Sequence, residues 1–309
     1  MVLFSIALVT MFTSVSSGAV SSEDIQKIQN AAPAKATVTP KQPRKLLVFN
    51  LCNGAVHDSI PYWDKALEII GDKTGAYKAV VSSDMNMFKA ENLKQFDAVC
   101  LNNTTRLKFD PELRKSLMDF IKGGKGIVGI HAAVDNFYDW PEATEMMGTR
   151  FTSHPWIDNK EWAVKIDEPD HPLMAAFKGK GFKILDEIYR TAPPLYSRDK
   201  QLVLMSLDMS DPVTRKPANV DAGISWIKNY GKGRLFYCSL GHSIPVTWNP
   251  AVLRHCLDGI QFAFGDLQVD ATPGTQKAQK GLKQLLGKIA DYDYGKSRAD
   301  LSKITNLLR

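Results

Sequence analysis

Three histidines follow segments of the chain that are predicted to be buried β-strands, and each stands where such a strand ends. They are His57, His131 and His242. In an open α/β sheet, ligands bind outside the carboxyl ends of the strands. We therefore expect these three imidazoles to meet in a polar pocket at one edge of a sheet.

Further polar and aromatic residues accompany these histidines. Those expected to contact a substrate are His57, Asp58, Ser59, Asp135, Tyr138, Trp140, Trp156 and Trp248. A fourth histidine, His154, lies in an aromatic-rich stretch that we expect to hang over the same edge. Asp186 and Glu187 stand at the predicted start of an apolar strand, where one carboxylate can act as a general base. The catalytic candidates are His131, His154, Glu187 and His242.

The segment Gly129-Ile130-His131-Ala132-Ala133 is typical of a strand that runs into a sharp turn with small neighbours. α/β enzymes use this local geometry to present a nucleophile. Neutral imidazoles beside a carboxylate can serve as general acid and base or can bind a divalent metal such as zinc. The candidate metal ligands are His131, His154 and His242, which come from distant loops because the sequence has no H-x-x-x-H pair and no CxxC.

The remaining histidines and the cysteines have structural interpretations. His171 lies in Asp170-His171-Pro172, which is typical of a turn, and His255 lies within a predicted helix. The cysteines fall in apolar strand-like or helix-like runs, which predicts buried free thiols rather than disulfides. They are Cys52, Cys100, Cys238 and Cys256.

Apolar runs alternate with helical patterns along the chain. The predicted strands are 46–51, 78–82, 97–102, 126–130, 201–207, 224–229 and 234–240, the last two forming a hairpin. Nearly continuous apolar runs are typical of parallel strands buried on both faces, and their alternation with helices indicates a doubly wound sheet. We predict an α/β protein of the flavodoxin-like kind, with a mostly parallel sheet, helices on both faces and a short C-terminal helical extension.

The ends of the chain differ in composition from its centre. Residues 1–22 combine an apolar stretch with small residues and suit a cleavable signal peptide, which implies a periplasmic or secreted protein. Residues 23–45 are polar with three prolines and are predicted to be a linker. The main domain is expected over 46–268. A helical extension over 274–309 could contact a protein partner or lead into a downstream domain.

The charge pattern argues against several classes of partner. The net charge of +6 is spread along the chain without a long basic run, so we do not expect binding to nucleic acid. The apolar stretch near the start is too short to span a bilayer comfortably, so no membrane span is expected after signal removal. The glycines around Lys125 end a predicted helix rather than open one, which argues against a phosphate-binding loop.

With these residues in view, the chain resembles the ThuA-like family, named for trehalose utilisation, within the class I glutamine amidotransferase-like superfamily. The resemblance runs from about Lys45 to Gln268. The segments that carry it are His57-Asp58-Ser59-Ile60, Gly129-Ile130-His131-Ala132-Ala133 with Trp140, His154-Pro155, Asp170-His171-Pro172, Asp186-Glu187-Ile188-Tyr189, and Gly233-Arg234 through Leu240-Gly241-His242 to Trp248.

The resemblance implies that His131 stands where amidotransferases carry their nucleophilic cysteine and that His242 approximates their catalytic histidine. Glutaminase chemistry is not expected, because a thioester needs a thiolate at this turn and none of the cysteines is there. Members of the family are linked to the breakdown of trehalose and of oxidised, 3-keto disaccharides. We therefore expect a protein that acts on such sugars, with Trp140, Trp156 and Trp248 offering flat faces to pyranose rings.

Three interpretations stay open at this point. The first is an enzyme of lyase or hydrolase type that uses His and Glu side chains as acid and base and needs no nucleotide cofactor. The second is a sugar-binding or scaffold module without turnover. The third is a metal-dependent hydrolase with a divalent ion such as zinc.

Overall fold

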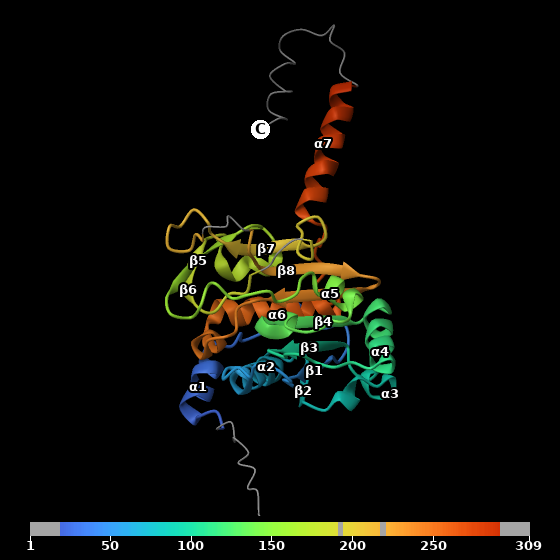
Figure 1. Ribbon diagram of the computed structural model, residues 1–309, viewed down its shortest axis with the longest axis vertical. Coiled ribbons are helices and arrows are strands. Elements are labelled where there is room, and N and C mark those ends of the chain that lie inside the picture. Colours follow the sequence, from blue (N-terminus) through green and yellow to red (C-terminus); the bar gives the residue numbers. More distant parts are fainter. Residues whose placement is uncertain (1–18, 191–193, 217–220, 291–309) are drawn as a thin grey trace, which may run out of the picture.

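A nine-stranded sheet forms the centre of the molecule, with the strand order β2-β1-β3-β4-β9-β8-β7-β5-β6 (Figure 1). The computed structural model describes residues 19–190, 194–216 and 221–290. The strands are β1 (Lys45–Phe49), β2 (Lys78–Ser82), β3 (Ala98–Asn102), β4 (Gly126–Ile130), β5 (Glu161–Ile166), β6 (Phe182–Leu185), β7 (Leu202–Leu207), β8 (Gly223–Tyr230) and β9 (Gly233–Cys238).

Helices and short 3-10 turns connect these strands. The α-helices are α1 (Ser22–Ala31), α2 (Ile60–Thr74), α3 (Ala90–Leu93), α4 (Pro111–Lys122), α5 (Pro141–Met147), α6 (Pro250–Phe264) and α7 (Gly274–Ala290). The 3-10 helices are η1 (Met85–Phe88), η2 (His131–Val134), η3 (Pro172–Phe177) and η4 (Ile244–Trp248).

The sheet has a parallel half and an antiparallel half. Strands β2, β1, β3, β4 and β9 pair in parallel, whereas β9, β8, β7, β5 and β6 pair antiparallel. The predicted doubly wound, mostly parallel sheet is therefore wrong, although the α/β class is correct. The physical reason is that an apolar run reports burial on both faces and not direction: β7 is buried along its whole length, yet it pairs antiparallel.

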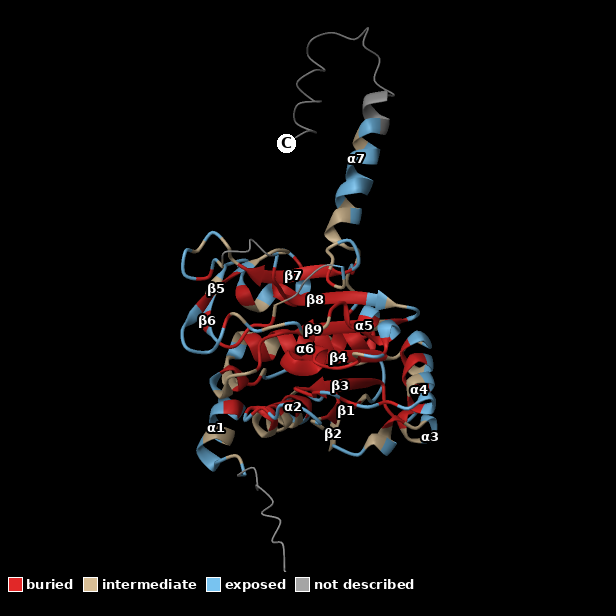
Figure 2. Cartoon of the chain, in the orientation of Figure 1, coloured by how far each residue is buried: buried red, intermediate tan, exposed pale blue. Residues whose placement is uncertain are grey.

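Helices cover both faces of the sheet, as predicted. Alternate residues of β1 divide between the two layers: Leu46 and Val48 pack with α2 and α6, whereas Leu47 and Phe49 pack with α4 and α5. This division follows from the two-residue period of a strand. Figure 2 shows the central strands and α6 as the most buried part of the molecule, whereas the edge strands β2 and β6 are more exposed.

The sequence signals at helix ends act as predicted. The Asp110 side chain accepts a hydrogen bond of 2.8 Å from the Leu113 N–H, Pro111 is the first residue of α4, and Gly123 follows its end. Asn249 caps α6 in the same way. These caps satisfy N–H groups that have no partner within a helix.

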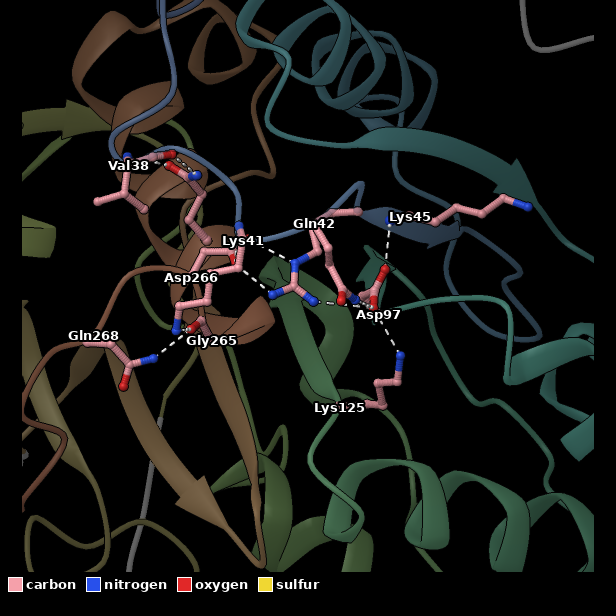
Figure 3. A network of polar contacts seen from close by, with 11 residues as sticks. Val38, Lys41, Gln42, Lys45, Asp97, Lys125, Gly265, Asp266 and Gln268 are labelled. Atoms are coloured by element: carbon pink, nitrogen blue, oxygen red, sulfur yellow. Dashed lines mark hydrogen bonds and ion pairs between the residues drawn. The ribbon is translucent and has the colours of Figure 1, made fainter.

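Residues 19–44, which we call the N-terminal arm, lie against the domain. The arm includes most of the predicted linker, and Ser21, within the predicted signal peptide, caps α1. Ile28 is fully buried, and the Thr37 N–H donates 2.8 Å to the Gln261 side chain. Arg44 forms an ion pair of 2.5 Å with Asp266. Figure 3 shows the polar network that fastens this arm to the start of β1 and the end of α6.

The C-terminal helix α7 points away from the sheet (Figure 1) and is largely exposed (Figure 2). Its Leu282 and Leu286 side chains are both exposed. Residues 291–309 of the predicted extension and residues 1–18 of the predicted signal peptide lie outside the described residues. Among the described residues, no helix combines the length and apolar character needed to cross a membrane. The cysteines are unpaired, as predicted.

Candidate functional site

The carboxyl ends of several strands bring the predicted residues together. His57 lies between β1 and α2, His131 begins η2 directly after β4, and His242 follows β9. Glu187 follows the end of β6 rather than starting a strand, which corrects the predicted position. Its segment continues past the end of β6 to the histidine cluster, where the Tyr189 ring lies 4.4 Å from the ring of His131.

The sharp turn predicted at His131 is present. His131 has a φ of 45°, which is uncommon for a residue other than glycine. Its Nδ1–H donates a hydrogen bond of 2.9 Å to the Ser239 carbonyl, and its own carbonyl accepts 2.7 Å from the Tyr237 hydroxyl. Because a carbonyl can only accept, the Nε2 atom of His131 presents a free lone pair.

The Glu187 carboxyl group is the common partner of the imidazoles. Its Oε2 atom lies 3.0 Å from His154 Nδ1 and 4.0 Å from His242 Nε2, and its Oε1 atom lies 3.7 Å from His131 Nε2. The His57 ring is 5.0 Å from the His131 ring and 5.3 Å from the His242 ring. Four imidazoles thus surround one carboxyl group.

Burial controls the charge of this cluster. It lowers the pKa of His57 to about 4, helped by the nearby His242, and it lowers the pKa of His131 well below the ordinary value. The same cause raises the pKa of Glu187, while His242 and His154 act in the opposite direction. At neutral pH, His57 and His131 are therefore neutral imidazoles with one lone pair each.

Asp186 holds the loop that carries His242. The Asp186 side chain is fully buried and accepts hydrogen bonds of 2.7 Å from the N–H groups of Gly241 and Ser243. Burial raises the pKa of Asp186 to about 7. Ser59 donates 2.7 Å to the Gly241 carbonyl, so this predicted substrate contact instead positions the same loop.

A pocket of about 930 Å³ is bordered by four members of the cluster, namely His57, His154, Glu187 and His242. Its lining residues are Gly54, Ala55, Val56, His57, Asp58, Arg106, Asp135, Phe151, His154, Asp158, Leu185, Glu187, Tyr189, His242, Ser243, Ile244 and Pro245. His131 lies beneath this surface, fully buried. Tyr138 is not a lining residue, and its hydroxyl group donates to Asp135.

The tryptophans predicted to hold a sugar lie away from the pocket lining. Trp156 is fully buried, with its Nε1–H donating 2.8 Å to the Thr214 carbonyl, and Trp140 packs between Phe109 and Phe137. Trp248 packs against Tyr62. An indole ring serves a hydrophobic core as well as it serves a sugar site, so residue type could not separate the two roles.

The pocket has two aromatic rings of its own. Phe151 stacks on His154 at 5.9 Å and lies 4.5 Å from the ring of Tyr189. Tyr189 stands two residues after Glu187, so its proximity to the carboxylate could have pointed to it. The phenylalanine carried no comparable signal.

Two charged lining residues were also missed by sequence reasoning. Asp158 Oδ2 lies 3.5 Å from His242 Nδ1, and Arg106 Nε lies 3.3 Å from Asp135 Oδ1. Asp158 follows His154 by four residues in one loop, which is a usable signal, but nothing in the sequence marks Arg106. His171 and His255 lie outside the pocket lining, in agreement with their predicted structural roles.

A group of donor atoms with the spacing needed for a metal ion is present among the described residues. His57, Glu187 and His242 each place one donor within 4.8 Å of the others. This group shares only His242 with the predicted ligands His131, His154 and His242. His131 and His154 lie beside it, each facing the Glu187 carboxyl group.

Comparison with known proteins points to one family. The family model described as ThuA, trehalose utilisation, matches residues 45–263. A ThuA-like protein from Bacteroides uniformis has a TM-score of 0.58 at 21% identity, covering 72% of this chain and 93% of that one. A ThuA-like protein from Parabacteroides merdae has a TM-score of 0.56 at 19% identity, covering 72% and 90%. No curated protein matches the chain.

Proposed function

Because the chain belongs to the ThuA, or trehalose utilisation, family, we propose that it is an exported enzyme acting on trehalose-type or 3-keto disaccharides by acid–base chemistry. The observation that carries this proposal is the convergence of His131, His154 and His242 on the Glu187 carboxyl group at one pocket. Export is tested separately, by measuring the mass of the mature protein isolated from its own host: removal of a signal peptide would lower that mass.

His154 and Glu187 form the pair best placed to move a proton. The His154 side chain is 51% exposed and lines the pocket, so a substrate can reach it. Glu187 is largely buried behind it at 3.0 Å and fixes the ring orientation. An imidazole held by a carboxylate is a common arrangement for general acid–base catalysis.

A 3-keto disaccharide suits this pair because the carbonyl group acidifies the proton on C2. In the proposed step, the His154 imidazole takes that proton, the C1=C2 double bond forms, and the C1–O glycosidic bond breaks. The imidazolium then returns the proton to the departing oxygen. The products are an unsaturated keto sugar and a free sugar, with no change in oxidation state and no nucleotide. Addition of water to the double bond would complete a net hydrolysis.

The pocket composition supports a polar ligand of this size. Charged and polar groups line much of it, and Phe151 and Tyr189 offer rings to the apolar face of a pyranose. Arg106 and Asp135 provide further hydrogen-bonding groups on the lining. Pockets of about 300–1,000 Å³ are usual for small-molecule ligands.

The test is to incubate the pure protein with trehalose, 3-keto-trehalose and other 3-keto disaccharides and to follow products by NMR. We expect turnover of a keto substrate, and a His154→Gln variant should lower kcat/KM by about 10²-fold or more. His171→Gln, outside the pocket lining, is the matched control and should retain activity.

The outcomes separate the competing interpretations. Sugar binding without turnover would favour the non-catalytic binding module. Neither binding nor turnover with any disaccharide would contradict the proposed substrate class. Full activity of His154→Gln would contradict its assignment as the group that moves the proton.

A further inference from the structure

The proposed proton transfer leaves three imidazoles without a chemical role. His57, His131 and His242 pack together with ring centroids 5.0 to 5.3 Å apart, although one imidazole suffices for the step above. We infer that His57, Glu187 and His242 form a binding site for one divalent transition-metal ion of the zinc type. This names a cofactor for the site of the proposed function.

The donor spacing is close to that of a metal site. One donor atom from each of His57, Glu187 and His242 lies within 4.8 Å of the other two. With metal–donor bonds of about 2.1 Å, donors in a tetrahedral site stand about 3.4 Å apart. Each side chain therefore needs to move by less than about 1 Å to close on an ion.

Unpartnered nitrogens mark the same place. The Nε2 atom of His131 and the Nδ1 atom of His57 are buried without a hydrogen-bond partner, whereas the Nδ1 atom of His242 faces Asp158 Oδ2 at 3.5 Å. A buried polar atom without a partner is costly, and such atoms are few in folded proteins. The His57 and His131 rings that carry these two unpartnered nitrogens are in contact, so an ion beside them, reached by modest ring rotation, would reduce the cost of burying both nitrogens.

His131 has the support expected of a residue beside a metal. Its Nδ1–H is fixed on the Ser239 carbonyl at 2.9 Å, which directs the Nε2 lone pair to the side where Glu187 Oε1 lies at 3.7 Å. Metal-binding histidines almost always donate their other N–H to a carbonyl or carboxylate in this way. His131 therefore stands beside the three ligands, with its Nε2 lone pair on the side of Glu187.

The donor types select the class of ion. Two imidazole nitrogens and one carboxylate oxygen suit zinc and its neighbours cobalt, iron and manganese, whereas magnesium and calcium prefer oxygen alone. His57, Glu187 and His242 all line the pocket, so an open coordination position would face the substrate. An ion there would polarise a sugar carbonyl or hydroxyl group.

Cobalt binding to tag-free full-length protein provides the test. The protein is stripped with a chelator, freed of it and titrated with Co²⁺ while the visible absorption is recorded, and the bound ion is counted by elemental analysis. We expect one Co²⁺ per chain, displaced by Zn²⁺. His57→Ala and His242→Ala should each weaken Co²⁺ binding by at least about tenfold. His171→Gln should bind as the unaltered protein does.

If a histidine variant does not fold, Co²⁺ binding is measured instead on Glu187→Gln, which preserves the shape of the side chain and should also bind Co²⁺ more weakly. The inference is overturned if the unaltered protein binds no stoichiometric Co²⁺ or Zn²⁺, or if all three ligand variants bind as tightly as it does. The proposed function fails separately: stoichiometric metal binding without sugar turnover contradicts the function alone, whereas sugar turnover by protein that binds no stoichiometric Co²⁺ or Zn²⁺ contradicts the metal site alone.

Discussion

At the scale of single residues, position along the chain predicted the site better than residue type did. His57, His131 and His242 were expected to meet because each follows a strand, and their rings lie 5.0 to 5.3 Å apart. The tryptophans were chosen for their flat rings, which a core also uses, and Trp156 is fully buried. Arg106 could not be predicted, because its place in the pocket depends only on the fold.

His255 shows how a buried imidazole acts outside the pocket. It is fully buried, its Nδ1–H donates 2.8 Å to the Leu173 carbonyl, and Ser225 Oγ lies 2.8 Å from its Nε2. Burial lowers the pKa of His255 to about 4. The unfolded chain therefore binds a proton near pH 6.5 that the folded chain accepts only near pH 4.

We expect the contribution of His255 to the free energy of unfolding to be fully present above pH 6.5. It is lost as the pH falls towards 4, because the unfolded chain binds a proton there that the folded chain does not. The loss amounts to up to about 3 kcal/mol in the free energy of unfolding. Urea unfolding of the unaltered protein and of His255→Gln between pH 7 and 4 measures it. Because other buried groups titrate in both proteins, the difference between the two pH slopes isolates His255. Parallel slopes would show that His255 titrates normally.

At the scale of elements, the sequence predicted the parallel half of the sheet and missed the direction of most of the other half. The runs before His57 and His131 became β1 and β4 as expected, and the short turn between β8 and β9 predicted their hairpin. The outer strands β5 and β6 were not predicted. The burial pattern of β6 is mixed, so it lacks the continuous apolar run of a central strand.

Close packing of α6 on the sheet gives a prediction at this scale. A Cβ atom at Gly259 would lie 2.3 Å from ring atoms of Phe236 on β9, which is fully buried and cannot move freely. Gly259→Ala should therefore lower the free energy of unfolding by about 1–3 kcal/mol. Gly281→Ala is the matched control, since nothing lies within 4 Å of its added Cβ. Thermal unfolding followed by circular dichroism compares them, and equal melting temperatures would contradict this packing.

At the scale of the whole molecule, the N-terminal arm closes one side of the core and α7 leaves it. Both segments are similarly polar in composition, but Ile28 of the arm is fully buried whereas Leu282 of α7 is 57% exposed. A linker and a docked arm can share one composition, because the difference lies in the surface that receives the segment. Here that surface is α6, through contacts such as Gln261 with Thr37.

In the folded molecule, the loops that follow β1, β4, β6 and β9 meet at one pocket around Glu187. Among the described residues, none of those that line this pocket is a cysteine, which is consistent with the proposed acid–base chemistry. In the proposed mechanism, a proton leaves C2 of a keto sugar during cleavage. The transfer involves the His154 imidazole beside the Glu187 carboxyl group.

The most direct test of this proton transfer is the cleavage rate of 3-keto-trehalose carrying deuterium at C2, compared with the ordinary compound. If the C2 proton is removed in the step that limits cleavage, the deuterated sugar reacts several-fold more slowly. If removal is fast and reversible, deuterium is washed out into the solvent before cleavage. Cleavage of both sugars at equal rates with the deuterium retained in the product would contradict the account.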